Sequence, residues 1–227
     1  MGVDEQKRAA GEAAVDLIEP GMVVGLGTGS TAAAFVRALA IRRVDIRGVA
    51  TSEATADLAR LMKIPLLDLN EAKSIDMTVD GADEIGPGLS LIKGAGGALL
   101  REKLVWEASR CCVVIAEAAK RVATLGAMPL PIEVVAFGHA TTLARIEAVL
   151  QGFGMPVFPH LRVRDGAPVR TDSGNLIYDA VCGVIDDPAG LAAALKGVTG
   201  VVEHGLFLNL AGTALVGTDE GVVRIDL

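Results

Sequence analysis

Short apolar runs alternate with stretches of helical spacing from residue 23 to residue 115. The apolar runs cover residues 23–26, 46–50, 66–69, 77–79 and 113–115, and the helical stretches cover residues 31–40, 53–62 and 98–109. Strands of a parallel sheet are apolar on both faces because helices cover the sheet from both sides. The sequence therefore predicts an α/β fold with a mostly parallel, Rossmann-like sheet and helices on both of its faces.

The pattern changes after Met128-Pro129-Leu130-Pro131. A strand at 132–135, a helix at 141–150, strands at 157–164 and 176–184, a helix at 189–195 and a strand near Val201 follow in that order. This order is typical of the split βαβ, or ferredoxin-like, arrangement. We expect an α/β catalytic domain over residues 1–128 and 205–227, with short strands at its end, and a small α+β lid domain over residues 129–204.

Composition excludes several classes of partner. The 227 residues carry a net charge of −7, and 51% of them are hydrophobic. Nucleic-acid binding needs clustered Lys and Arg, and a membrane span needs roughly 20 apolar residues, and neither is visible. The three histidines stand far apart, and Cys111, Cys112 and Cys182 are expected in the core. We expect a cytoplasmic protein with no nucleic-acid or membrane partner and no metal site.

A run of small residues between the first strand and the first predicted helix is suited to holding phosphate. Glycine N–H groups can approach an anion closely, and hydroxyls and the helix N-terminus add further donors. The dinucleotide fingerprint would need glycine at Ser30, and a triphosphate-binding loop would need a lysine before Ser30 or Thr31. A tight turn with Ser30 as helix cap is the alternative. The candidate phosphate contacts are Thr28, Gly29, Ser30 and Thr31.

Three further segments follow predicted strands, where open α/β sheets place their ligands, and the third is the run 116–120, which ends in Lys120. Asp80 and Asp83, in the run Asp80-Gly81-Ala82-Asp83-Glu84, could contact sugar hydroxyls or share a proton, and an aspartate turn is the alternative. In the second segment, Lys93 and the N–H groups of Gly94, Ala95 and Gly96 could stabilise an oxyanion.

Glu102 is the unusual residue of this second segment. If a helix begins near Gly97, its neighbours one turn away are apolar, so the carboxylate should be partly desolvated and suited to act as a general base. The alternative is a solvated glutamate. Lys120 could add a cation for phosphate, although a surface lysine is commoner, and Lys7 has still less support. Together these residues fit proton transfer beside the carbonyl of a sugar phosphate, and they require no redox cofactor.

At these residues the chain closely resembles the A-type ribose-5-phosphate isomerases. The resemblance extends over nearly the whole length, through GLGTGST at 25–31, TSEAT at 51–55, DGADE at 80–84, KGAGGALLREK at 93–103, PLPIEV at 129–134, TDSGN at 171–175 and GLFLN at 205–209. It implies interconversion of ribose 5-phosphate and ribulose 5-phosphate in the non-oxidative pentose phosphate pathway. It also implies that no cofactor or metal is used, and that the chain forms a homodimer or a dimer of dimers.

The resemblance also implies roles for individual residues. Glu102 would move a proton between C1 and C2 through an enediolate, and Lys93 with the loop backbone would stabilise the oxyanion. Asp80 and Asp83 would bind hydroxyls and assist ring opening. Other substrate contacts would come from Thr28, Gly29, Ser30, Thr31, Gly81, Ala82, Gly94, Ala95, Gly96 and Lys120. Family members often have glycine at Ala95 and a hydroxyl residue at Ala119.

Two other classes are the alternatives. A sugar-phosphate sensor of related fold could keep the glycine turns without catalysis, although such sensors usually carry a basic DNA-binding module that this chain lacks. An acyl- or coenzyme-A-transferring relative would use a glutamate nucleophile and form a covalent thioester.

Overall fold

The computed structural model describes residues 1–155 and 158–227 and divides into two compact units. Unit 1 contains residues 1–82, 101–121 and 209–227, and unit 2 contains residues 83–100 and 122–208. The chain passes from one unit to the other between Ala82 and Asp83 and again inside helix α4, between Leu100 and Arg101. Each unit has its own hydrophobic core.

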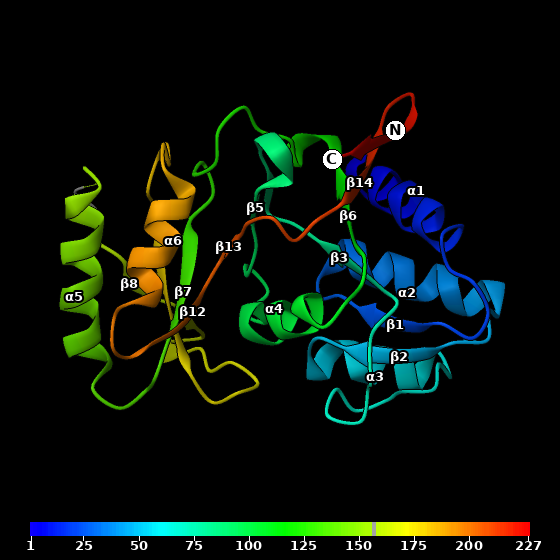
Figure 1. Cartoon of the computed structure of the whole chain (residues 1–227), viewed down its shortest axis with the longest axis horizontal. Helices are drawn as coiled ribbons and strands as arrows, with labels where there is room; N and C mark the ends of the chain where they lie inside the picture. The colour runs from blue at the N-terminus through cyan, green and yellow to red at the C-terminus, as the bar shows by residue number, and fades with distance from the viewer. Residues whose placement is uncertain (156–157) are drawn as a thin grey trace. The chain divides into compact units, whose positions relative to one another are not determined.

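Unit 1 is an α/β unit around a six-stranded sheet (Figure 1). Its elements are α1 (Val3–Val15), β1 (Val23–Leu26), α2 (Ser30–Arg42), β2 (Arg47–Ala50), α3 (Glu53–Leu61), β3 (Met77–Gly81), most of α4 (Leu99–Glu107), β6 (Cys112–Glu117), η2 (Ala118–Lys120), β14 (Thr213–Thr218) and β15 (Gly221–Asp226). The strand order is β15-β14-β6-β3-β1-β2, and all pairs are parallel except the terminal hairpin of β14 and β15. The predicted mostly parallel sheet is confirmed.

Helices cover both faces of this sheet. On one face, Val24 and Leu26 of β1 pack with Phe35 of α2 and Ala14 of α1. On the other face, Val23 packs in a separate cluster with Val105 of α4, Val49 and Ile75. The two clusters use alternate residues of the same strand, as the pleat requires, so the prediction of helices on both faces is also confirmed.

Unit 2 is built from antiparallel strands. Its elements are β4 (Glu84–Ile85), η1 (Pro87–Leu89), β5 (Leu91–Ile92), β7 (Leu130–Val134), α5 (His139–Gly152), β8 (His160–Leu161), β9 (Val163–Arg164), β10 (Ala167–Pro168), β11 (Leu176–Ala180), α6 (Pro188–Lys196), β12 (Val201–His204) and β13 (Leu206–Phe207). The main sheet has the order β12-β7-β11-β8. Helices α5 and α6 contribute Ile146, Leu150, Leu191 and Leu195 to the core that covers this sheet (Figure 1). The chain order of strands and helices is the predicted ferredoxin-like one.

Several boundaries differ from the sequence predictions. The predicted strand at 66–69 is wrong, because only Leu66 forms a bridge, to Gly48. Strand 157–164 is two short strands, and its first residue, 157, lies outside the described residues. The compact units also differ from the expected domain limits, because β13 pairs with β5 and because Ile92 and Leu125 lie in the core of unit 2. Residues 83–100, 122–128 and 205–208 therefore group with that unit. Among the described residues, no helix is long and apolar enough to cross a membrane.

Candidate active site

The loops of interest in unit 1 lie at the carboxyl edge of its parallel sheet. Strand β1 pairs with β2 on one side and with β3 on the other, so the chain reverses its direction of winding between β1 and β3. Open α/β sheets bind ligands outside such a switch point. Thr28 lies just after β1 and Asp80 is the second-last residue of β3, so both residues stand at this point, and Lys120 lies after the neighbouring strand β6.

The glycine turn after β1 is fixed by a cluster of hydroxyl groups. The Oγ1 atom of Thr28 lies 2.7 Å from Thr51 Oγ1, 2.8 Å from Ser52 Oγ and 3.2 Å from Thr55 Oγ1. The segment at 51–55 therefore braces the turn from the next strand. The TSEAT motif at 51–55 therefore has the role of holding Thr28, a role that was not predicted from the sequence.

Helix α2 begins directly after this turn. Gly29 occupies the N-cap position with φ of 105°, a conformation that glycine adopts without strain, and Ser30 is the first helical residue. The alternative of Ser30 as the cap is therefore wrong. Gly29 and Ser30 are exposed, whereas Thr31 is buried. The first turn thus presents backbone N–H groups at an exposed, positive helix end, which is the arrangement that binds phosphate.

Asp80 is fully buried and is held by N–H groups of the protein. Its Oδ1 accepts the backbone N–H groups of Thr28 at 3.0 Å and of Gly81 at 2.7 Å. Its Oδ2 accepts the indole N–H of Trp106 at 3.2 Å. Three donors satisfy much of the hydrogen-bonding capacity of a buried carboxylate and offset its desolvation. Asp80 thereby ties the phosphate-type turn to helix α4.

Glu102 lies in the first turn of α4 and is only 4% exposed. The expectation that it faces apolar surroundings agrees with this burial, and the alternative of a solvated glutamate is wrong. Its place in the first turn puts it at the helix end where backbone N–H groups favour acidic side chains. On the same helix, Arg101 binds Glu53 of α3 at 2.8 Å, and Lys103 is also buried.

Lys120 and Lys7 are half-buried, so neither is a freely solvated surface lysine. Lys120 ends η2, whose first residue, Ala118, donates its N–H to Gln6 of α1 at 3.2 Å. Gln6 precedes Lys7, so this bond connects the two lysine-bearing segments within unit 1.

In unit 2, Lys93 is 2% exposed and follows β5. Its Nζ lies 5.5 Å from the centroid of the Phe207 ring, within the range of a cation–π contact. Its backbone N–H donates to Gly205 O at 2.9 Å, and a Cβ at Gly205 would overlap the carbonyl oxygen of Lys93. Gly205 and Phe207 belong to the GLFLN motif, so the structure gives this motif the role of seating Lys93.

The glycine-rich loop after Lys93 is a tight turn. Gly94 has φ of 108°, Gly97 has φ of 83°, and the Gly97 N–H donates to Gly94 O at 3.0 Å. The Ala95 N–H donates to Asp83 Oδ2 at 2.9 Å, which brings together two of the predicted site segments. Of the three N–H groups expected to stabilise an oxyanion, that of Ala95 is thus engaged within the protein, and the Gly97 N–H closes the turn. Ala95 and Gly96 are exposed, and the Gly96 N–H lies on this exposed part of the turn.

Glu84, the last residue of the DGADE run, has a different role from the aspartates. It is 1% exposed, and its carboxylate accepts the N–H groups of Gly126 at 2.7 Å and Met128 at 2.5 Å. It anchors the segment that leads into β7. Such long-range partners leave no local pattern, so sequence reasoning missed this role.

A second buried carboxylate, Glu133 in β7, lies behind the start of α4. Its Oε1 accepts the Thr171 hydroxyl at 2.9 Å and the Asn175 amide at 3.0 Å. The backbone N–H of Leu100, in the first turn of α4, also faces the carboxylate and lowers its pKa, but burial outweighs these donors and the net pKa of Glu133 is raised. The TDSGN and PLPIEV motifs meet at this contact.

The described residues contain no cluster of three or more His, Cys, Asp and Glu side chains suited to a metal ion. Cys112 and Cys182 are buried, as predicted, whereas Cys111 is half-buried, and all three are free thiols. Burial raises the pKa of Cys112 to about 12 and that of Cys182 to about 11, so neither forms a thiolate nucleophile at neutral pH.

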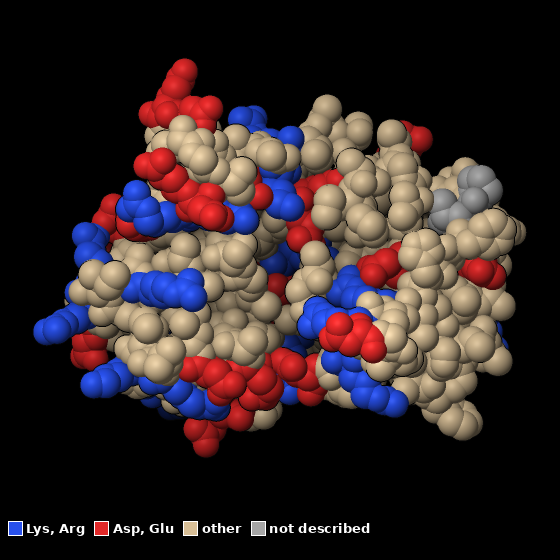
Figure 2. All heavy atoms as spheres, turned by 180° about the vertical axis from the view of Figure 1, so that it is seen from behind, with Lys and Arg blue, Asp and Glu red and all other residues tan. Residues whose placement is uncertain are grey.

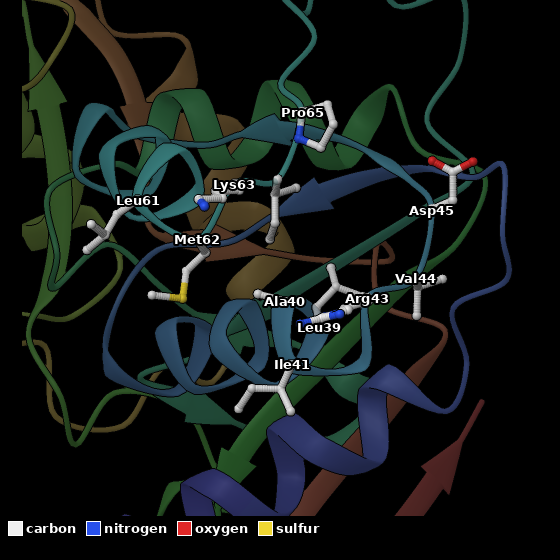
Figure 3. Close-up of a pocket in the computed structure, with 11 residues that line it drawn as sticks. Leu39, Ala40, Ile41, Arg43, Val44, Asp45, Leu61, Met62, Lys63 and Pro65 are labelled. Atoms are coloured by element: carbon white, nitrogen blue, oxygen red, sulfur yellow. The ribbon is translucent and has the colours of Figure 1, made fainter.

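The surface of the molecule has two further features. On the face in Figure 2, Lys and Arg side chains are interspersed with Asp and Glu. Figure 3 shows a pocket of about 790 Å³ between the ends of α2 and α3, lined by Leu39, Leu61 and Met62 among others. It contains none of the predicted site residues.

Comparison with known proteins gives a consistent result. The family model for ribose 5-phosphate isomerase A (phosphoriboisomerase A) matches residues 47–221. A ribose-5-phosphate isomerase A of Caulobacter sp. (strain K31) is 66% identical over 225 residues, covering 99% of both chains.

Solved structures agree over the full length. A D-ribose-5-phosphate isomerase in complex with phospho-erythronic acid is 39% identical, with a TM-score of 0.93 and 100% of both chains covered. The ribose 5-phosphate isomerase A of Neisseria gonorrhoeae is 36% identical, with a TM-score of 0.92, covering 99% of this chain and 97% of that one.

Proposed function

This chain belongs to the ribose 5-phosphate isomerase A family and is an aldose–ketose isomerase, and we propose that Glu102 is the base of its reaction. The substrates are ribose 5-phosphate and ribulose 5-phosphate. The burial of Glu102 at 4% exposure in the first turn of α4 is the observation that supports its role. A desolvated carboxylate is a stronger base toward a carbon acid than a solvated one.

The proposed reaction moves one proton between carbons and one between oxygens, and it leaves the sugar's composition unchanged. With the open aldehyde bound, Glu102 takes the proton from C2, and the electron pair moves to the carbonyl oxygen at C1 to give an enediolate. The same carboxylic acid returns the proton to C1, while the proton of the C2 hydroxyl passes to the oxygen on C1, so that C2 becomes the ketone and C1 carries the hydroxyl. Lys93 and the Gly94–Gly97 backbone would stabilise the negative charge that develops on oxygen.

The two aspartates are assigned different roles. Asp83 would contact sugar hydroxyls and assist ring opening, because its carboxylate is half-buried and holds the oxyanion turn through Ala95. Asp80 would act through the turn at Thr28, because three N–H groups already occupy its carboxylate. Gly81 and Ala82 connect the two and are proposed to approach the substrate with their backbone.

The phosphate group would bind at the exposed start of α2, through Thr28, Gly29, Ser30 and Thr31, with Lys120 as a further cation. A relative of known structure binds phospho-erythronic acid. Its carboxylate resembles the planar, anionic enediolate, so we expect this chain to bind the same compound.

Location and assembly are further parts of the proposal. Free cysteines are typical of a reducing compartment, which supports the cytoplasm. The family resemblance supports a homodimer or a dimer of dimers. Light scattering on the eluting chain would decide between these states, and a monomer would contradict both.

The decisive test is cofactor-free turnover of ribose 5-phosphate by the purified chain and by Glu102→Gln. We expect the variant to lose about 10³-fold or more in kcat while still binding ribose 5-phosphate. Glu107→Gln is the matched control, because Glu107 lies on the same helix but is exposed, and it should keep wild-type turnover. Near-normal turnover of Glu102→Gln would remove Glu102 from the mechanism.

A further inference from the structure

Arg162 contacts the oxyanion turn from the protein side. It follows β8, and its side chain is 14% exposed. Its Nη1 atom lies 3.0 Å from Gly94 O and 3.1 Å from Ala95 O, so one N–H₂ group bridges two successive carbonyls of the turn. Gly97 closes the same turn, and a Cβ there would lie 3.8 Å from Nη1.

Asp179 fixes the orientation of this guanidinium. The Nε atom of Arg162 donates to Asp179 Oδ2 at 2.7 Å, and Nη2 donates to Oδ1 at 2.5 Å. Asp179 lies on β11, opposite His160 of β8, and Arg162 directly follows β8, so the pair joins neighbouring parts of the sheet. A two-point pair of this kind sets direction as well as distance, and a lysine cannot reproduce it.

The position of the two carbonyls determines where the amide groups of the turn point. In a trans peptide the C=O and N–H bonds point in opposite directions. With Gly94 O and Ala95 O directed at Arg162, the N–H groups of Ala95 and Gly96 are directed away from it. The Ala95 N–H meets Asp83, which confirms this geometry for the first of the two peptides.

We propose that Arg162, oriented by Asp179, is a positioning residue that aims the Gly96 N–H of the Gly94–Gly97 turn at the substrate oxyanion, while the Ala95 N–H is held by Asp83. The cation also polarises the two peptide groups whose carbonyls it contacts, which makes their N–H groups stronger donors. Arg162 itself does not touch the substrate. This inference rests on the proposed role of the turn in stabilising the enediolate.

The test compares Arg162→Lys with the wild type and with Arg164→Lys. Arg164 is an exposed arginine two residues further along, so its variant controls for the loss of a guanidinium from this segment. We expect Arg162→Lys to lower kcat by about 100-fold, because misplacement of a group in the site by about 1 Å costs that much, with KM changed less than about threefold. Affinity for phospho-erythronic acid should fall with kcat, while affinity for ribose 5-phosphate is retained. Arg164→Lys should match the wild type.

A purely structural role would give a different result. Folded Arg162→Lys with kcat within about twofold of the wild type would overturn the proposal, and so would equal weakening of both ligands. If Arg162→Lys does not fold, Asp179→Asn decides, because it leaves the guanidinium in place but removes its charged partner. A lower kcat in folded Asp179→Asn supports the proposal, and an unchanged kcat overturns it. Absence of isomerase turnover in the wild type would instead contradict the proposed function.

Discussion

The Oδ1 atom of Asp80 accepts the backbone N–H of Thr28 at 3.0 Å, so the aspartate at the end of β3 holds the turn that follows β1. The same carboxylate reaches Trp106 of α4, the helix that carries Glu102. One buried side chain therefore connects the proposed phosphate-binding turn to the helix of the proposed base.

Asp80→Asn should destabilise the protein by about 1–3 kcal/mol. The asparagine amide is neutral, and its NH₂ group must replace either Oδ1 or Oδ2 of the aspartate. In both cases an N–H group of the protein would face another donor, so a buried donor would lose its acceptor. Urea unfolding followed by circular dichroism measures the change. Trp106→Phe is the companion variant, because it keeps the ring but removes the indole donor, and its cost should be smaller. An Asp80→Asn variant as stable as the wild type would show that these three hydrogen bonds contribute little.

Gly27→Ala and Gly81→Ala form a matched pair, because Gly27 directly follows β1 and Gly81 is the last residue of the neighbouring strand β3. A Cβ at Gly27 would overlap the Asp80 carboxylate and lie 2.5 Å from its Cα, whereas a Cβ at Gly81 would meet nothing closer than 3.8 Å. We expect the first variant to lose about 1–3 kcal/mol of unfolding free energy and the second to stay within about 0.5 kcal/mol of the wild type. Thermal unfolding of both variants tests this difference, and equal losses would contradict the packing explanation.

The parts of the fold that the sequence predicts are those with strong local patterns. Strands β1, β3 and β6 are buried along their whole length or nearly so, and they appear as apolar runs. Helix α1 was missed because its buried residues are mostly small: Ala10, Gly11 and Ala14 give little contrast in hydropathy. The run at 66–69 is apolar, but it forms only a single bridge, because local hydropathy does not specify pairing.

The same distinction applies to the candidate site. Glu102 could be proposed from its apolar neighbours, and its burial agrees with that reasoning. Arg162 could not be found in this way, because it is 67 residues from Ala95 and its contacts are to backbone carbonyls, which carry no residue-specific signal. Thr171 and Asn175 were recognised only as part of a family motif, since their partner Glu133 lies on a different strand.

The pH dependence of stability should report the burial of Glu133. Burial raises its pKa above the ordinary 4.5, and the nearby Glu203 carboxylate on β12 raises it further. The folded state then binds this proton more tightly than the unfolded state, so the contribution to stability is complete below pH 4.5 and is lost as the pH rises through the folded-state pKa. Glu133→Gln removes the titration but keeps an oxygen for Thr171 and Asn175. The unfolding free energy of the wild type minus that of Glu133→Gln should therefore fall as the pH rises above 4.5, as measured by urea unfolding at a series of pH values. A difference that stays constant or rises over this range would show that the carboxylate is ionised in the fold as readily as in the unfolded chain.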